Sequence, residues 1–241
     1  MRPFLTILAS ILQRYSPRTP RRSPLRDWRP FFPSDEVLAA SNGLVPIAIG
    51  GDLRPERLLF GYRHGIFPWF DEGDPILWWS PDPRGIFELD GLHISRRLQR
   101  TIRSGRFTVT INQDFAGVIR GCADRDVGTW ITPQVIDAYE GLHGLGAAHS
   151  VEVWHEDVLA GGLYGVAVGG FFAGESMFTR VRDASKVALA FTMERLRERG
   201  FRLFDIQFVT DHTTRLGAIE IARADYLKRL ADAMKVEAAF G

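Results

Sequence analysis

The sequence has little cysteine, which limits the chemistry that it can carry. Cys122 is the only cysteine in 241 residues, so an intramolecular disulfide and a thiolate metal site are both excluded. The six histidines also lack a metal-ligand spacing. A chain of this length buries a sizeable core without such cross-links. A single cysteine fits a reducing compartment, and we predict a cytoplasmic location.

Long apolar runs and a large net charge are missing as well. The mostly apolar stretch at residues 4–12 is far shorter than the roughly 20 residues that span a bilayer, and we expect no membrane partner. The net charge is +1, so contact with nucleic acid must rest on local basic patches. Six arginines and no acid precede Asp27. Residues 1–27 are therefore predicted to be a flexible basic arm, with an RNA-contacting arm or a targeting segment as alternatives.

Several common catalytic and nucleotide-binding motifs are also absent. Gly161-Gly162 and Gly169-Gly170 lack the spacing of a phosphate-binding loop that opens a helix. No Gly-x-Ser-x-Gly run occurs, and Cys122 lies in no signature of a nucleophile. These absences argue against a nucleotide fingerprint and against a serine or cysteine nucleophile.

What is present is a mixture of helical and strand patterns, which predicts an α+β fold. Residues 28–84 are predicted to form a small N-terminal α/β domain, in which Asp52 caps a helix with Pro55 in its first turn and Gly65 at its end. It closes with a strand at residues 76–80. In residues 85–241 we predict helices at 93–103, 115–122, 133–145, 225–234 and between Asp183 and Gly200, with strands at 107–111, 150–154, 163–168, 171–178 and 201–209.

A polar pair on one predicted strand is the sharpest sign of a site. Strand alternation places Asp205 and Gln207 on one face, and Phe204, Ile206 and Phe208 on the other. Burying an acid and an amide is unfavourable unless they are hydrogen-bonded or used. The alternatives are that they bond to a loop or face solvent at a sheet edge.

Glu175 is a second candidate, because it is a carboxylate among apolar and small residues on a predicted hairpin strand. A structural ion pair with Arg180, Arg182 or Lys186 would also explain it. If it lies near Asp205, the two carboxylates could hold or deprotonate an amine. Sequence spacing does not settle whether they are close.

Aromatic and basic clusters suggest contact with RNA. The aromatic residues Phe67, Trp69, Phe70, Trp78, Trp79 and Trp130 either pack in a core or stack on the bases of a single-stranded RNA end. A cationic cluster follows the predicted helix at residues 93–103, and Arg96, Arg100 and Arg103 share one of its faces. Such a stripe can follow a phosphate backbone, although a solvated basic face is the alternative. The whole cluster is Arg96, Arg97, Arg100, Arg103 and Arg106.

Taken together, these segments resemble the leucyl/phenylalanyl-tRNA–protein transferases nearly continuously from Phe32 to about Met234. The run Gly174-Glu175-Ser176-Met177-Phe178 is fairly specific on its own, and the ordered set of runs is highly specific. The others include Gly50-Gly51-Asp52-Leu53, Arg63-His64-Gly65-Ile66-Phe67-Pro68-Trp69-Phe70, Trp78-Trp79-Ser80-Pro81-Asp82-Pro83-Arg84, Gly128-Thr129-Trp130-Ile131-Thr132, Asp205-Ile206-Gln207 and Asp211-His212-Thr213.

The resemblance implies an acetyltransferase-like (GNAT) catalytic domain at residues 85–241, without a metal or nucleotide cofactor. It implies transfer of Leu, Phe or sometimes Met from aminoacyl-tRNA to proteins with N-terminal Arg or Lys, which marks them for degradation by the N-degron pathway. A monomer is expected.

The resemblance also implies roles for single residues. Asp205 would orient or deprotonate the acceptor amine, with Gln207 in the same relay. Glu175 would hold the aminoacyl-adenosine end or the basic acceptor. Trp69 and Trp130 would pack against the terminal adenosine, and the Arg96 face would take the acceptor-stem phosphates. The pocket for the transferred side chain would be formed by Leu163, Phe172, Met177, Leu189 and Phe204.

Three positions depart from the family pattern. Thr210 replaces an Asn that is proposed to belong to the proton relay, Asp183 replaces an Asn before the helix, and Thr192 stands where an aromatic can line the pocket. These changes bear on amino-acid preference and rate. Two alternatives stay open: a tRNA-binding relative without catalysis, suggested by Thr210, and an acyl-CoA-dependent acyltransferase, although the pyrophosphate-binding turn of that class is missing.

Overall fold

A seven-stranded sheet organises the chain in the computed structural model, which describes residues 31–34, 38, 41, 43–125 and 128–241. The predicted arm over residues 1–27 lies outside these residues. The strand order is β10-β4-β9-β8-β7-β6-β5, and every neighbouring pair is antiparallel except β8 and β9. Their bounds are β4 Arg84–Phe87, β5 Thr108–Ile111, β6 Ala148–His155, β7 Val158–Val168, β8 Phe171–Thr179, β9 Leu203–Gln207 and β10 Ile219–Ile221.

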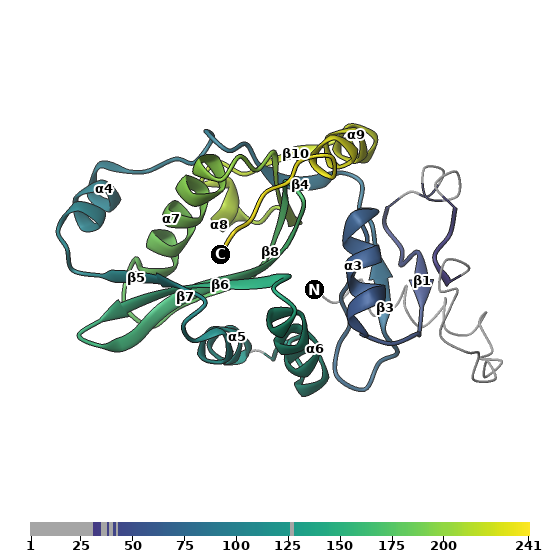
Figure 1. Ribbon diagram of the computed structural model, residues 1–241, viewed down its shortest axis with the longest axis horizontal. Coiled ribbons are helices and arrows are strands. Elements are labelled where there is room, and N and C mark those ends of the chain that lie inside the picture. The colour runs from purple at the N-terminus through teal and green to yellow at the C-terminus, as the bar shows by residue number, and fades with distance from the viewer. Residues whose placement is uncertain (1–30, 35–37, 39–40, 42, 126–127) are drawn as a thin grey trace. The chain divides into compact units, whose positions relative to one another are not determined.

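Helices cover both faces of this sheet (Figure 1). Helix α7 (Ala184–Glu198) lies on one face, and α5 (Phe115–Ala123) and α6 (Pro133–Gly144) lie on the other. The other helices described after residue 85 are α4 Arg96–Arg103, α8 Asp211–Thr214 and α9 Arg223–Ala233. In the part of the chain that the structure describes, no helix is long and apolar enough to cross a membrane. The arrangement confirms the predicted α+β class.

A smaller sheet precedes the large one in sequence. Strand β3 (Leu77–Trp79) lies between β1 (Ala48–Ile49) and β2 (Phe67–Pro68), and helix α3 (Pro55–Arg63) connects β1 to β2. Gly65 ends this helix as predicted, with a positive φ of 72° that glycine adopts without strain. Arg84 is the last residue of the predicted N-terminal domain and also the first residue of β4 in the large sheet.

Strands β8 and β9 separate soon after they begin to pair. Their parallel pairing covers only residues 171–173 and 203–205, whereas β8 continues to Thr179. Beyond this point β8 contains a bulge, because Gly174 pairs with Gly165 but Ser176 pairs with Tyr164, which leaves Glu175 as the extra residue. Bulges redirect side chains and are common beside functional sites. The strand split and the bulge together place Glu175 beside the end of β9.

The predicted starts of α3 and α4 were wrong in detail, whereas the predicted start of α7 at Asp183 was correct. The residue before α3 is Arg54, and Asp52 instead accepts a hydrogen bond from the Arg54 backbone N–H at 3.2 Å. Helix α4 begins three residues later than predicted, because the Ser95 side chain caps it. Asp183 does precede α7, but in the left-handed conformation and without a side-chain cap, since its carboxylate pairs with Arg97 and Lys186.

Helical spacing predicts that Ile94, Leu98 and Ile102 form one apolar face of the helix at residues 93–103, and this prediction was wrong. Leu98 is buried, whereas Ile94 and Ile102 are exposed. A helix whose apolar residues stay exposed has only a narrow contact with the core. Strand β10, helix α8 and the short strands β1, β2 and β4 were not predicted, because pieces of two to four residues are too short to show a periodicity.

Candidate active site

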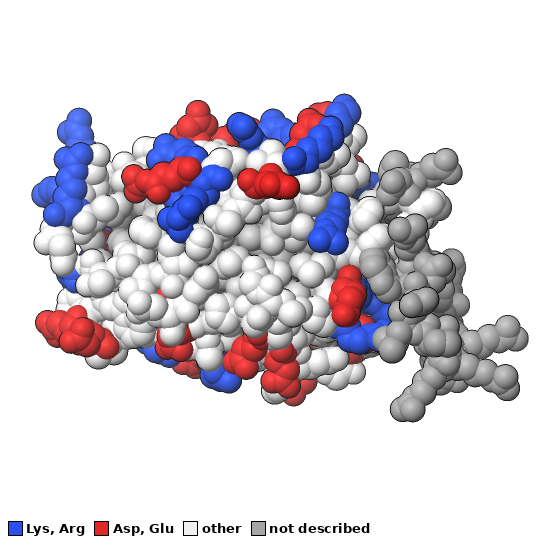
Figure 2. All heavy atoms as spheres, viewed as in Figure 1, with Lys and Arg blue, Asp and Glu red and all other residues white. Residues whose placement is uncertain are grey.

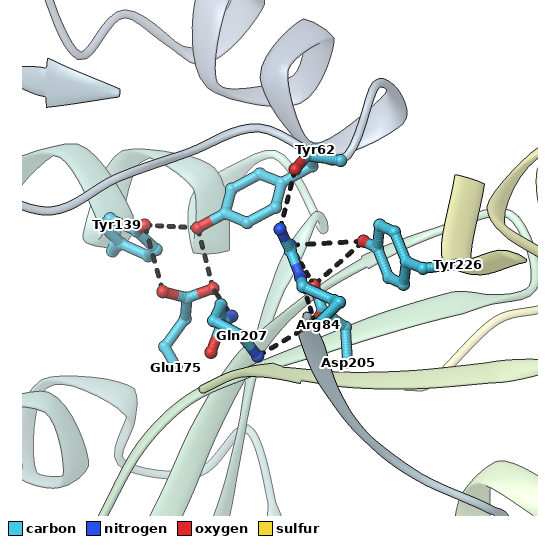
Figure 3. A network of polar contacts seen from close by, with 8 residues as sticks. Tyr62, Arg84, Tyr139, Glu175, Asp205, Gln207 and Tyr226 are labelled. Atoms are coloured by element: carbon cyan, nitrogen blue, oxygen red, sulfur yellow. Dashed lines mark hydrogen bonds and ion pairs between the residues drawn. The ribbon is translucent and has the colours of Figure 1, made fainter. Parts of the chain in front are cut away.

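Glu175 is the centre of one hydrogen-bonded cluster (Figure 3). The Tyr62 hydroxyl donates to Glu175 Oε1 at 2.8 Å, and the Tyr139 hydroxyl donates to Oε2 at 3.4 Å. The two hydroxyl oxygens also lie within hydrogen-bond distance of each other, so the two phenolic protons are shared among three contacts. Tyr62 comes from α3 and Tyr139 from α6, so helices far apart in sequence meet at the bulge of β8. The structure therefore pairs Glu175 with phenols, and not with the arginines or lysine considered as ion-pair partners.

Asp205 and Arg84 form the second cluster, a bidentate ion pair that is almost completely buried. Arg84 Nε donates to Asp205 Oδ1 at 2.8 Å, and Arg84 Nη2 donates to Oδ2 at 2.6 Å. The exposed fractions of the two side chains are 1% and 0%. The remaining acceptor positions of Asp205 take the Tyr226 hydroxyl at 3.1 Å and the Gln207 backbone N–H at 2.9 Å. Four donors thus saturate this carboxylate, as a buried charge requires.

The guanidinium of Arg84 also connects separate parts of the chain. Its Nη1 donates to the Gly65 carbonyl at 2.9 Å, immediately after α3, and its carbon atom Cζ lies over the rings of Phe67 and Tyr226 at 4.8 and 4.5 Å. Only arginine combines a planar set of donors with a flat surface that stacks on aromatic rings, so a lysine could not make these contacts. Arg84 therefore holds β9, α9 and the loop after α3 in one arrangement.

Gln207 joins the two clusters. Its backbone has a left-handed φ of 60°, and its N–H donates to Asp205 while its amide lies 3.3 Å from Glu175 Oε1. The amide is better satisfied when its nitrogen donates to the carbonyl oxygens of Ile206 and Gly174 at 2.9 and 3.0 Å. In that orientation its oxygen faces Glu175, a contact that is favourable only if Glu175 carries a proton. The orientation of Gln207 is thus coupled to the protonation of Glu175.

Burial controls the protonation of these groups. It raises the pKa of Glu175 to about 8, an effect that Asp205 reinforces and that the Tyr62 hydrogen bond and the Arg84 charge oppose. Burial also raises the pKa of Tyr62 and Tyr139 well above the usual phenol value, so both remain hydrogen-bond donors at neutral pH. For Arg84, burial opposes protonation, but the adjacent Asp205 raises its pKa above the ordinary value. The site therefore holds one fixed ion pair and one carboxyl that titrates near neutral pH.

The turn at Gln207 also changes the direction of the next side chain. Strand alternation predicted Phe208 on the face of Phe204 and Ile206, but Phe208 is 41% exposed, and its ring lies 5.6 Å from that of Trp69. Trp69 is 39% exposed and also contacts Trp79 at 5.9 Å. An exposed aromatic surface therefore borders the polar site. Trp130 is partly exposed in the loop before α6.

The five residues predicted to line an apolar pocket lie together. Phe172 and Phe204 face each other across β8 and β9 with ring centroids 5.5 Å apart, and both are fully buried. Leu163, Leu189 and Met177 belong to or pack against the same hydrophobic cluster, which lies between the sheet and α7. Their proximity follows from pairing, because Leu163 on β7 is opposite Met177 on β8.

The predicted arginine stripe is exposed on α4, where basic side chains project at the left of the view in Figure 2. Arg97 pairs with Asp183 at 3.0 Å. By contrast, Arg96, Arg100 and Arg103 have no ion-pair partner among the residues that the structure describes. These three charges are available to a phosphate backbone.

Comparison with known proteins identifies the family. A family model for the leucyl/phenylalanyl-tRNA protein transferases matches residues 86–231, and a model for their N-terminal domain matches residues 51–82. The chain belongs to the leucyl/phenylalanyl-tRNA–protein transferase family. Similar relatives with that name come from Solidesulfovibrio magneticus (53% identity over 88% of this chain and 86% of the relative), Anaeromyxobacter sp. strain K (54%, 86% and 89%) and Escherichia coli O139:H28 (55%, 83% and 85%).

Similarity to solved structures is weaker. A ribosomal-protein-alanine N-acetyltransferase from Brucella melitensis is 15% identical with a TM-score of 0.34, over 44% of this chain and 81% of the other. The L-PGS structure from Bacillus licheniformis is 12% identical with a TM-score of 0.37, over 65% and 52%.

Two departures from the transferase family pattern are explained by their surroundings. Thr210 caps α8, where its hydroxyl accepts from the Thr213 backbone N–H at 3.2 Å, and Thr210 N–H donates to the Thr213 side chain at 2.8 Å. This hydroxyl is therefore engaged outside the Asp205 cluster. Thr192 is fully buried on α7, where its hydroxyl donates to the Ala188 carbonyl at 2.9 Å.

The sequence patterns of this transferase family member did not indicate four residues of the site, namely Tyr62, Arg84, Tyr139 and Tyr226. The spacing of Tyr62 with Leu58 and Leu59 predicts only an ordinary apolar helix position for it, and Arg84 stands out only as part of a run that matches the family. A basic residue directly after Asp82-Pro83, at the start of a buried strand, was the available signal for Arg84. The other two residues, Tyr139 and Tyr226, carry no signal in sequence because a buried tyrosine pattern looks like an ordinary core.

Proposed function

We propose that this chain transfers leucine or phenylalanine from aminoacyl-tRNA to the N-terminal arginine or lysine of acceptor proteins. One observation carries the proposal: relatives 53–55% identical over most of the chain have the transferase name. The coupled cluster of Arg84, Asp205, Gln207 and Glu175 supports it, since it supplies polar groups at the strand split. A monomeric enzyme with a catalytic domain at residues 85–241 is part of the same proposal.

The proposed reaction requires that the enzyme position the acceptor amine and the aminoacyl ester, and it needs no covalent enzyme intermediate. The neutral α-amine attacks the aminoacyl ester carbonyl, a peptide bond forms, the ester C–O bond breaks, and the terminal ribose hydroxyl leaves with a proton. Because four donors saturate Asp205, we assign it the orientation of Gln207, whose amide then contacts the reacting amine. Glu175 holds the basic acceptor or the aminoacyl-adenosine end.

We assign the surrounding surfaces to the acceptor end of an aminoacyl-tRNA. Trp69 and Trp130 provide aromatic faces for the terminal adenosine, since base–aromatic stacking tolerates any base. The cluster around Phe172 and Phe204 takes the transferred apolar side chain. The exposed arginines of α4 take the phosphates of the acceptor stem.

The decisive experiment is transfer of labelled Leu or Phe from charged tRNA to a peptide with N-terminal Arg. We expect a new peptide bond with this peptide and none with the same peptide acetylated at its N-terminus, because acetylation removes the nucleophile. No transfer despite intact tRNA binding would instead favour a non-catalytic tRNA-binding protein. Saturable stabilisation by acetyl-CoA in a thermal-shift assay would favour an acyl-CoA-dependent enzyme.

Removing the stripe should weaken tRNA binding without changing the chemistry. For the triple variant Arg96→Ala/Arg100→Ala/Arg103→Ala, we expect a higher KM for tRNA, a nearly unchanged kcat, and a salt dependence of binding reduced by about 2–3 in log–log slope. Filter binding at several salt concentrations measures this slope. Arg197→Ala/Arg199→Ala/Arg202→Ala removes the same charge from the exposed last turn of α7 and the residues that follow it, and serves as the control. Equal losses of tRNA affinity in the two triple variants would contradict a dedicated tRNA contact on α4.

A further inference from the structure

Phe240 is an unexpected member of the apolar cluster. It lies outside every predicted helix and strand, yet it is only 1% exposed. Its ring stacks on Phe172 with centroids 4.8 Å apart and an interplanar angle of 22°, and it meets Phe201 edge-on at 6.2 Å. The ring of His149 lies 5.2 Å away. One face of Phe172 is therefore backed by a residue near the end of the sequence.

The path of the segment after α9 is fixed by the glycine turn between β7 and β8. Gly170 N–H donates to the Ala233 carbonyl at 2.8 Å, and a Cβ added at Gly170 would lie only 2.9 Å from Val236 Cβ. At the other end of the segment, Arg195 Nε of α7 donates to the Phe240 carbonyl at 2.9 Å. Contacts before and at Phe240 thus specify where its ring lies.

Helix α7 contributes two small, completely buried side chains to the core of the protein. Ala188 and Thr192 lie one turn apart, and both are completely buried. Bulky residues elsewhere must fill the space that small residues leave, because protein interiors are close-packed. Phe240 belongs to the same cluster as Ala188 and supplies such bulk from another segment.

We propose that Phe240 is a specificity-determining residue that sets the depth of the pocket for the transferred amino-acid side chain. It acts by backing Phe172, which with Phe204 lines this pocket in the proposed function on which the inference rests. Without the Phe240 ring, Phe172 can move away from Phe204, and the pocket becomes larger. A larger pocket favours phenylalanine over leucine, since each methylene of misfit in an apolar pocket changes kcat/KM by roughly 10-fold or more.

Phe240→Leu and Phe240→Ala test this inference with the full chain. The measurement is kcat/KM for transfer of Leu and of Phe, each from its own charged tRNA, to the peptide with N-terminal Arg. We expect the Phe:Leu ratio to rise about fivefold or more, and further in the alanine than in the leucine variant. The ratio is the informative quantity, because a purely structural loss lowers both rates equally.

Phe32→Ala is the matched control, since Phe32 is 5% exposed and stacks on Phe60 outside the cluster of Phe240. This variant should keep the wild-type ratio. An unchanged ratio in folded Phe240→Leu, with the wild type active, would overturn the inference alone. A wild type that transfers neither amino acid would overturn the proposed function together with it. If thermal unfolding shows that the alanine variant does not fold, the smaller leucine change decides the question.

Discussion

Arg84→Met should abolish most of the transfer activity and also destabilise the fold. We expect the free energy of unfolding to fall by about 3–5 kcal/mol, because the substitution leaves the Asp205 carboxylate buried without its partner. We expect kcat to fall by about 100-fold or more. Without Arg84, the Asp205 carboxylate no longer holds the Gln207 backbone in place, and small displacements in an active site greatly reduce the reaction rate. Chemical denaturation and steady-state transfer measure the two effects.

The double variant Arg84→Met/Asp205→Leu separates stability from catalysis. Replacing a whole buried ion pair by apolar residues is often neutral or stabilising, so this variant should recover most of the lost stability. It should stay inactive, because Gln207 N–H then lacks the acceptor that holds its left-handed turn. Recovery of activity together with stability would show that the pair only supports the fold.

Another buried arginine offers a comparison. Arg223 is 2% exposed and donates to the Ser80 carbonyl at 2.7 Å and the Ser41 carbonyl at 2.6 Å, but to no residue of the Asp205 or Glu175 clusters. Arg223→Met should therefore be destabilising with a much smaller change in kcat for the molecules that remain folded. Equal losses of kcat in both arginine variants would contradict the positioning role of Arg84.

Glu175→Gln should make the protein more stable at alkaline pH and less active. The folded-state pKa of Glu175 is raised from 4.5 to about 8 by burial, so the folded protein retains a proton that the unfolded chain loses. The resulting stability is fully present below about pH 4.5 and is lost as pH rises through about 8. The loss at alkaline pH is on the order of a few kcal/mol. Gln is neutral throughout, so its variant should lack this loss.

The activity of Glu175→Gln should fall by about 10-fold to 100-fold for a different reason. The carboxyl accepts from both Tyr62 and Tyr139 and faces Gln207, whereas an amide has one acceptor oxygen only. Unfolding midpoints between pH 5 and pH 9, with transfer assays at the same pH values, test both parts. Glu194→Gln, on an exposed part of α7, controls for the loss of one glutamate. A pH dependence of stability in Glu175→Gln equal to the wild type would refute the assignment.

Residue patterns in the sequence determined most of the fold and indicated three of the polar residues of the site. The spacing of apolar residues predicted the longer helices and strands, and Gly169-Gly170 predicted the hairpin between β7 and β8. Asp205, Gln207 and Glu175 were conspicuous because polar groups in apolar strands are unfavourable unless they are paired. The ordered motifs predicted the family, which the comparisons confirmed.

Only the tertiary structure decided how these residues meet. The bulge at Glu175 and the left-handed turn at Gln207 depend on strand pairing, which sequence spacing does not reveal. Arg84 reaches Asp205 across 121 positions because β4 lies beside β9 in the sheet. Tyr62 reaches Glu175 across 113 positions because α3 packs against α6 and β7. Local secondary-structure propensity contains no information about such long-range contacts. The sequence therefore determined which groups need partners, while packing determined which partners they have.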